Sequence, residues 1–560
     1  MRIAAIVALF CGMAFGAVPL VRQSVHVPMR DGVKLAANVF FLQSAARQPV
    51  ILVRTPYNKG KDLSANFRFF VEHGYTMVVE DVRGRYQSEG VFDPFHQETN
   101  DGEDTLNWIA RQPWSNGRIG MVGGSYLGIV QWKAALSGNP HLKAIFPVVS
   151  GCDDYTDRFF STGGAMKLGN RLLWLSSNMR APGFTPPDFT LFVRHLPVKE
   201  ADRAATGQKV AMYQTALEHP TYDSYWKSIS TRERLEQIRI PVFSVGGWYD
   251  NFVQSDLEAF TLLRRLGRTA HAMIGPWAHS MSIPFEGVSF GHEGSAPVLR
   301  MQLDWFDRWL KNDSTKARYA PLRIFVMGVN RWRDEQEWPL ARAVATPFYL
   351  AARHGANSVL GDGILAAHPL KRSRADRFVY DPANPAPTRG GGTCCNPKIF
   401  PWGPMDQSPV EKRRDVLVYT SPVLEKDLEV TGPVKAVLWV STSARDTDFT
   451  VKLLDVAPGG RATNLTDGIL RLRYREGLDR AMPAKPGAVY RILVDAGVTS
   501  NVFRAGHPIR VEISSSNFPR FDRNPNTGGP LAPETRFVKA EQRVYQGGAN
   551  ASHLLLPVAH

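Results

Sequence analysis

The sequence alternates continuous apolar runs with stretches of helical periodicity, and this alternation restricts the fold more than any other feature. Residues 49–53 (PVILV) and 76–79 (TMVV) are apolar without interruption, as expected of strands buried on both faces of a parallel sheet. Between them, residues 63–73 carry apolar side chains at helical spacing and end at Gly74, a typical helix stop. The pattern predicts an α/β domain.

The α/β pattern is interrupted once. Further strands and helices of this type are predicted at residues 101–111, 118–122, 144–149, 240–245, 271–274 and 298–310. Residues 151–235, by contrast, are rich in aromatic residues and helical segments and contain no strong strand. We therefore assign residues 24–150 and 236–340 to one α/β domain that carries residues 151–235 as a helical insertion.

Beyond about residue 345 the chain changes to an all-β pattern. Short apolar runs recur between turn signals, at residues 416–419, 434–440, 449–456, 490–494 and 509–513. This repetition predicts a β-sandwich or jelly roll over residues 345–560. Residues 381–403 hold five prolines and four glycines, so we expect a long surface loop there.

The sharpest local signal is the sequence GGSYLG at residues 123–128, between a predicted strand and a predicted helix. A serine on such a tight turn is raised above the sheet edge, and the following helix directs its free N–H groups toward the place where negative charge develops. Leu127 occupies the position of the second glycine of the common five-residue motif, and Gly128 comes one residue later. Ser125 is therefore the candidate nucleophile.

A nucleophilic serine needs a base and an acid that orients the base, and in hydrolases of this type they follow in the order Ser, Asp or Glu, His. Asp250 closes the sequence GGWYD after one predicted strand, and His279 closes GPWAH after the next. Active sites of open α/β sheets collect at these carboxyl ends of strands. We therefore predict a triad of Ser125, Asp250 and His279.

These three sequences resemble those of the cocaine-esterase-like (CocE/NonD) hydrolases of the X-Pro dipeptidyl-peptidase superfamily. The similarity extends from about Val25 to the C-terminus and includes RTPYNK at 54–59, DVRG at 81–84, SEG at 88–90 and DFTVKLL at 448–454. It implies an α/β-hydrolase domain, an inserted helical cap and a C-terminal jelly roll, which agrees with the pattern.

The resemblance also implies roles for residues around the triad. Tyr57 and the backbone amide of Tyr126 are expected to form the oxyanion hole, because a phenol stays protonated at neutral pH and can hydrogen-bond a developing oxyanion. Trp174 and Phe252 are expected to line the acyl pocket. The resemblance requires no metal and no organic cofactor.

The N-terminus predicts export. Residues 3–15 form a short apolar run after Arg2 and end in small residues, which is typical of a signal peptide over residues 1–17 and places the mature protein in the periplasm or outside the cell. No later segment is apolar enough to span a membrane. The formal net charge of +15 is scattered rather than clustered among aromatic residues, so we expect a basic exported surface and no nucleic-acid partner.

Three cysteines remain after the signal peptide: Cys152, Cys394 and Cys395. They permit one disulfide at most. Cys394 and Cys395 can form a vicinal ring, or one of them can pair with Cys152, and buried thiols are equally compatible with the sequence. Nothing in the sequence indicates an oligomeric state.

The expected substrate is a small ester or amide, cleaved through an acyl-enzyme. We favour a carboxylic ester over an X-Pro dipeptide, an amino-acid ester or a β-lactam. The branch that holds a substrate ammonium has acids just after the triad aspartate, where this chain has Asn251, Phe252 and Val253. Asp153, Asp154 and Asp157 are the acids that remain to bind an ammonium from near the cap. A catalytically silent binding protein is the alternative from another class.

Overall fold

The apolar runs predicted as buried strands lie at the centre of a large mixed sheet in the computed structural model, which describes residues 19–43, 46–282 and 284–560. Alternate side chains of β3 enter two separate cores: Val50 and Leu52 pack on one face, and Ile51 and Val53 on the other. A strand covered on both faces must be apolar throughout. The predicted signal peptide, residues 1–17, falls outside the described residues.

The strands of this first sheet run in the order β1-β2-β4-β3-β5-β6-β7-β8-β9-β10, and those from β4 to β9 are parallel. Their bounds are β1 (Leu20–Pro28), β2 (Lys34–Leu42), β3 (Gln48–Thr55), β4 (Thr76–Asp81), β5 (Ser115–Gly124), β6 (Leu142–Val148), β7 (Val242–Gly247), β8 (Ala270–Gly275), β9 (Leu322–Val326) and β10 (Arg331–Glu335). The first strand starts at Leu20, before the predicted domain start at residue 24.

Helices cover both faces of this sheet. The helices α1 (Ala65–Glu72) and α10 (Val298–Leu310) pack on the face that buries Ile51. The helices α2 (Glu98–Ala110), α3 (Tyr126–Ala135) and α9 (Val253–Arg265) pack on the other face. This is an α/β-hydrolase arrangement, as predicted.

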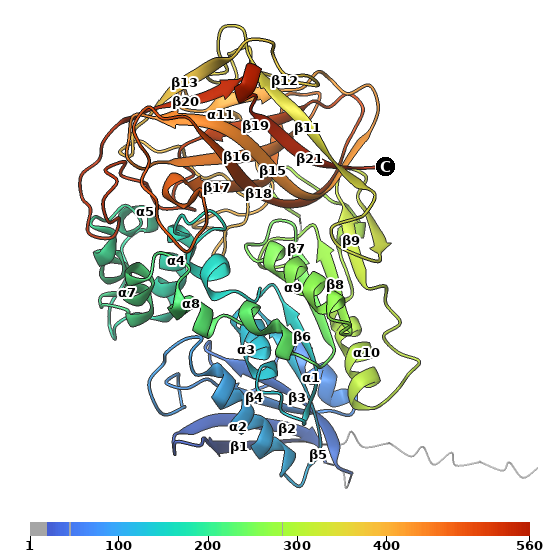
Figure 1. Ribbon diagram of the computed structural model, residues 1–560. Coiled ribbons are helices and arrows are strands. Elements are labelled where there is room, and N and C mark those ends of the chain that lie inside the picture. Colours follow the sequence, from blue (N-terminus) through green and yellow to red (C-terminus); the bar gives the residue numbers. More distant parts are fainter. Residues whose placement is uncertain (1–18, 44–45, 283) are drawn as a thin grey trace, which may run out of the picture.

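The segment between β6 and β7 forms a helical cap that lies beside the sheet and beneath the C-terminal domain (Figure 1). Its elements are the π-helical turn η1 (Asp154–Phe159), the helices α4 (Leu168–Asn178), α5 (Phe189–Phe192), α6 (Ala201–Thr206), α7 (Ala211–Glu218) and α8 (Ser224–Ile229), and the 3₁₀ turns η2 (Val198–Glu200) and η3 (Arg232–Gln237). At the start of α4 the cap meets the C-terminal domain, since the Gly169 amide donates to the Pro519 carbonyl at 2.8 Å.

The C-terminal part is a β domain, at the top of Figure 1, whose strands pair antiparallel except for β12 and β14. Its strands are β11 (Ala343–Ala351), β12 (Ile364–Ala366), β13 (Arg374–Tyr380), β14 (Leu417–Thr420), β15 (Leu428–Thr442), β16 (Asp448–Val456), β17 (Ala462–Arg471), β18 (Tyr490–Phe503), β19 (Ile509–Ser514), β20 (Ala540–Gln546) and β21 (His553–Ala559). Short elements η4 (His292–Gly294), α11 (Ser408–Glu411), η5 (Leu472–Tyr474) and η6 (Gly548–Asn550) complete the chain. Among the described residues, no helix has the length and apolar character needed to cross a bilayer.

Candidate active site

Ser125 lies on a strained turn between β5 and α3. Its backbone has φ 56° and ψ −124°, a region that L-residues rarely adopt and that is found at functional sites. Its amide donates to the Val148 carbonyl at 2.9 Å, which fixes the turn against β6. A Cβ on Gly128 would lie 2.6 Å from the Cβ of Ser150. Gly128 therefore allows α3 to approach the segment that follows β6, which explains why a glycine is needed at this position.

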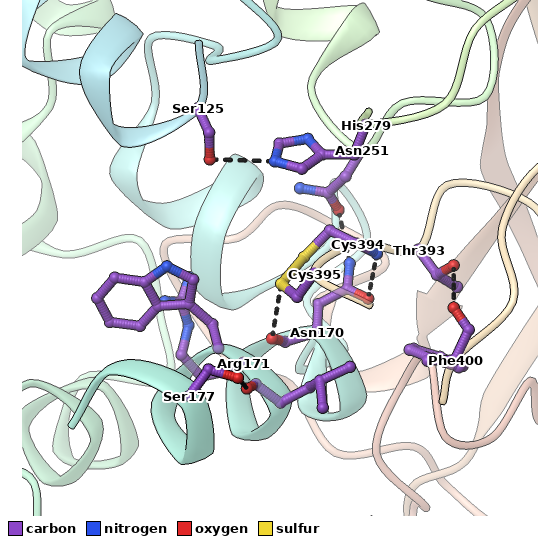
Figure 2. The surroundings of a disulfide bond; sticks show 12 residues. Ser125, Asn170, Arg171, Ser177, Asn251, His279, Thr393, Cys394, Cys395 and Phe400 are labelled. Carbon is purple, nitrogen blue, oxygen red and sulfur yellow. Dashed lines mark hydrogen bonds between the residues drawn. A yellow bond between two sulfur atoms is a disulfide. The ribbon is translucent and has the colours of Figure 1, made fainter. Parts of the chain in front are cut away.

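The three predicted triad residues meet at the carboxyl ends of β5, β7 and β8. His279 Nε2 is 3.0 Å from Ser125 Oγ, a contact shown in Figure 2. His279 Nδ1 is 2.7 Å from Asp250 Oδ1. The carboxylate of Asp250 is buried, and its second oxygen accepts the Phe252 amide at 3.1 Å. The acid is thereby held in one orientation with a single hydrogen bond left for the imidazole.

Tyr57 and Tyr126 lie beside the serine. The Tyr57 hydroxyl accepts the indole N–H of Trp174 at 3.2 Å, and the Ser125 side chain and the Tyr126 backbone amide are close enough to influence its pKa. Burial raises the pKa of Tyr57 above its ordinary value near 10. The phenol therefore remains a hydrogen-bond donor at neutral pH. Both predicted oxyanion donors line the same cavity as Ser125.

A buried ionic network holds the oxyanion side together. The fully buried guanidinium of Arg54 lies 2.7 Å from a carboxylate oxygen of Glu80 and 2.7 Å from one of Glu98. Glu98 in turn accepts the Tyr126 hydroxyl at 2.7 Å. In the next turn, the Lys59 amide donates to Asp81 at 2.7 Å. The motif residues at 54–59 and 81–84 thus fix the loop that carries Tyr57.

Aromatic side chains and cap residues enclose the substrate cavity. Trp174 stacks almost parallel to Tyr126, with 6.3 Å between ring centroids, and the Phe252 ring lies 5.6 Å from that of His279. Both predicted acyl-pocket residues therefore line the cavity. The complete lining is Tyr57, Phe95, Ser125, Tyr126, Ile129, Asp157, Arg158, Asn170, Arg171, Trp174, Asn251, Phe252, His279, Cys394 and Cys395.

The loop over residues 381–403 is not the surface loop that its composition predicts. Its central residues, 390–394, are buried, and the loop carries a Cys394–Cys395 disulfide into the cavity wall (Figure 2). The Cys394 amide donates to the side-chain oxygen of Asn170 on α4 at 3.2 Å. The glycines and prolines thus shape a segment that connects the β domain to the active site. Of the cysteine alternatives the vicinal ring is the one formed, and Cys152 is a buried free thiol.

The three cap acids are engaged with protein cations. Asp154 lies 2.7 Å from Lys133 and 3.4 Å from Arg158, and Asp153 lies 3.5 Å from Arg232. Asp157 lines the cavity, but burial raises its pKa. The expectation that these acids supply free negative charge to a substrate is therefore wrong for Asp153 and Asp154. Within the described residues, no cluster of three or more histidine, cysteine or acidic side chains has the form of a metal site.

Comparisons with known proteins identify the family of this chain. Residues 31–281 match the model of the X-Pro dipeptidyl-peptidase (S15 family), and residues 314–555 match that of the X-Pro dipeptidyl-peptidase C-terminal non-catalytic domain. The cocaine esterase of Rhodococcus sp. (strain MB1 Bresler) is 39% identical, over 96% of this chain and 98% of its own. The chain belongs to the CocE/NonD family of hydrolases. It is accordingly an enzyme of the serine esterase type.

Two solved structures share the whole fold. An α-amino acid ester hydrolase superposes with a TM-score of 0.82 at 26% identity, over 99% of this chain and 98% of the other. An aminopeptidase from a marine sediment archaeon, Thaumarchaeota archaeon, also gives a TM-score of 0.82 at 26% identity, over 97% of both chains. The names of these two proteins refer to different bonds, so the similarity establishes a hydrolase architecture but does not identify the substrate.

The sequence did not predict that four residues of this CocE/NonD chain, Asn170, Arg171, Cys394 and Cys395, line the cavity. Asn170 and Arg171 are on α4, and the sequence of this helix contains no motif that indicates a binding site. The disulfide residues come from a domain that begins about 220 residues after Ser125 in sequence. Only the position of Arg171, three residues before Trp174 and so on the same helix face, gave a usable signal.

Proposed function

We propose that the chain is an exported serine esterase that cleaves small carboxylic esters through an acyl-enzyme formed on Ser125. The hydrogen-bonded series Asp250–His279–Ser125, with lengths of 2.7 Å and 3.0 Å, carries this proposal. It has the geometry required of an acid that orients a base and a base that can deprotonate a nucleophile. The strained backbone of Ser125 supports the same assignment.

In the first half-reaction, His279 Nε2 takes the hydroxyl proton while Ser125 Oγ forms a bond to the carbonyl carbon of the ester. The carbonyl oxygen becomes an oxyanion that accepts hydrogen bonds from the Tyr57 hydroxyl and the Tyr126 amide. The tetrahedral intermediate then collapses, the bond to the leaving oxygen breaks, and the imidazolium donates its proton to the departing alcohol. Asp250 stabilises the positive charge on the imidazole without itself becoming protonated.

In the second half-reaction, water replaces the alcohol. His279 takes a proton from the water as its oxygen attacks the acyl carbon, and the same two donors bind the second oxyanion. The acyl–serine bond breaks, the proton returns to Ser125 Oγ, and the carboxylic acid leaves. In both half-reactions the groups that transfer protons or bind the oxyanion are His279, Tyr57 and the Tyr126 amide, and water is the second reactant.

Esters are favoured over substrates that carry a free ammonium. An amino-acid ester or an X-Pro dipeptide presents a cation, which requires an unpaired carboxylate in the cavity. Asp157 is the acid that lines the cavity, but it lies 4.0 Å from the guanidinium of Arg158 and burial raises its pKa to about 7, so it is a poor partner for an ammonium. The residue after the triad acid is Asn251 rather than an acid. A second candidate function, peptide or amino-acid ester cleavage, has no comparable support from the cavity.

A fluorophosphonate probe and a substrate panel test the proposal. The purified chain should become labelled on Ser125, and Ser125→Ala should lose labelling and at least about 10³-fold of kcat while keeping its thermal midpoint. Among aryl esters, amino-acid esters and Xaa-Pro anilides, the aryl esters should have the highest kcat/KM. A wild-type chain that labels no better than Ser125→Ala would contradict the hydrolase, and strong anilide cleavage with weak ester turnover would contradict the ester preference.

Export has its own measurement. We expect the mature protein in the periplasmic or extracellular fraction, with an N-terminus close to residue 18 by N-terminal sequencing. Full-length protein recovered with Met1 in the cytoplasmic fraction would contradict it.

A further inference from the structure

The cavity contains a buried cation without an acidic partner. Arg171 lies on α4, three residues before Trp174, and lines the same cavity as Ser125 (Figure 2). The residue is only 7% exposed. Its Nη2 donates to the Arg158 carbonyl at 2.7 Å, and its Nε is buried without a hydrogen-bond partner. Buried guanidinium groups in proteins are normally paired with carboxylates, so this arrangement needs an explanation.

The neighbouring charges do not neutralise Arg171. Among the described residues, no carboxylate lies within 4.0 Å of its guanidinium. Asp154 is held by Lys133 at 2.7 Å, and Arg158 lies 3.4 Å from that same acid. Burial, together with the charge of Arg158, lowers the pKa of Arg171 to about 9. The side chain is therefore still mainly cationic at neutral pH.

Aromatic rings hold this guanidinium in place. Its central carbon lies 4.4 Å from the ring centroid of Phe159 and 5.5 Å from that of Trp174. Stacking of this kind occupies the faces of a planar guanidinium and leaves N–H groups at its edge for an acceptor. A carboxylate is the anion whose two oxygens match that edge.

We propose that Arg171 binds a carboxylate at the far end of the substrate's acyl chain, so that the preferred substrates are esters of dicarboxylic acids. This proposal rests on the esterase function proposed above. An acyl group attached to Ser125, with its oxygen at Tyr57, has Trp174 beside it because the Trp174 indole donates to the Tyr57 hydroxyl. Arg171 is on the next turn of the same helix face. The acyl chain can therefore extend along Trp174 to the cation.

Matched pairs of 4-nitrophenyl esters test the assignment. The mono-4-nitrophenyl esters of succinic, glutaric and adipic acids are compared with esters of neutral acids of equal chain length. For at least one length, wild type should have a kcat/KM about 10- to 100-fold higher for the carboxylate-bearing ester, the range expected for a buried charge-assisted hydrogen bond. Arg171→Gln should abolish that preference, so that kcat/KM for the carboxylate-bearing ester falls about 10- to 100-fold more than kcat/KM for the neutral ester.

Two variants serve as controls. Arg171→Lys retains the charge without the two-pronged edge and should recover part of the preference. Arg203→Gln removes an arginine from the exposed side of the cap, where the side chain is 59% exposed, and should leave the preference intact. If Arg171→Gln does not fold, competitive inhibition of wild type by glutarate relative to valerate provides the same comparison without a variant.

The outcomes separate this inference from the proposed function. Equal losses on neutral and anionic esters in Arg171→Gln, or no wild-type preference for an anionic acyl chain, would overturn the role of Arg171 while Ser125 still labels. A preference for a carboxylate on the leaving alcohol would overturn its assignment to the acyl side. Failure of wild type to label with fluorophosphonate would overturn both proposals together.

Discussion

Two buried arginines, Arg54 and Arg171, differ in the acidic side chains around them. Arg54, at the end of β3, has Glu80 and Glu98 at 2.7 Å and Asp101 at 4.0 Å. Burial alone lowers the pKa of Arg54, but these acids outweigh it and the pKa is raised. Arg171, in the cap, has no acid within ion-pair distance in the part of the chain that the structure describes, and burial lowers its pKa.

The difference separates structural charge from charge that is available to a substrate. A guanidinium surrounded by acids has its N–H groups and its positive charge satisfied within the protein. Arg54 therefore acts by fixing the loop and the helix that carry the oxyanion donors. A guanidinium held only by rings and one carbonyl retains both. The α/β domain thus supplies a rigid catalytic frame, which holds the triad and the oxyanion donors. The cap supplies a specificity wall, which contains Arg171 and can interact with the substrate.

The largest expected contrast is in stability. Replacing Arg54 with methionine leaves Glu80 and Glu98 buried and uncompensated, which should destabilise the chain by about 3–5 kcal/mol. Arg171→Met removes stacking but breaks no ion pair, and its effect should stay within about 1 kcal/mol. Thermal midpoints of the two variants, measured side by side, check the difference. Equal midpoints would mean that the two arginines do the same structural work.

The next effect is on the rate. Tyr57→Phe removes one oxyanion donor and should lower kcat about 10²- to 10³-fold with little change in KM. The loss should be the same for neutral and anionic esters, because Tyr57 belongs to the catalytic frame rather than to the specificity wall. Burial raises the pKa of Tyr57, so wild-type activity should show no decline from its ionisation up to about pH 9. If Tyr57→Phe changes the ratio of kcat/KM for anionic and neutral esters, the distinction between the catalytic frame and the specificity wall is wrong.

The smallest effect is expected at the disulfide. The Cys394 amide and Asn170 connect the β-domain loop to the helix that carries Arg171. Replacing both cysteines with serine should loosen this wall, raising KM about 2- to 10-fold while kcat stays close to wild type. Treating wild type with dithiothreitol should produce the same shift in KM. A fall in kcat at constant KM would instead place the disulfide in the catalytic frame.

The fold and the triad were predictable because their signals are local. Uninterrupted apolar runs predict strands covered on both faces, and Ser125, Asp250 and His279 each follow such a strand at the edge where active sites collect. Some strands of the β domain gave no such signal. The sequence of β20, AEQRVYQ, is mostly polar, and it forms a strand because β13 and β15 pair with it on its two sides.

The specificity wall was not predictable, for a different reason. Arg171 is important because it forms no ion pair with the described residues. A sequence does not show which charged side chains are paired with one another in the fold. Asp154 illustrates the same point, because it was a reasonable ligand for a substrate cation until Lys133 and Arg158 proved to hold it. The loop with Cys394 has the composition of a surface loop, and only tertiary packing buries it.

The origin of the cavity wall in three separate stretches of chain has a consequence for how the enzyme can diversify. The turn at Ser125, the cap helix at Arg171 and the loop at Cys394 belong to the core sheet, an insertion and a C-terminal domain. Mutation, insertion or exchange in the last two stretches can alter which acid is released without touching the bond-breaking groups. Relatives with one architecture and several reported activities are the outcome expected of such separate inheritance.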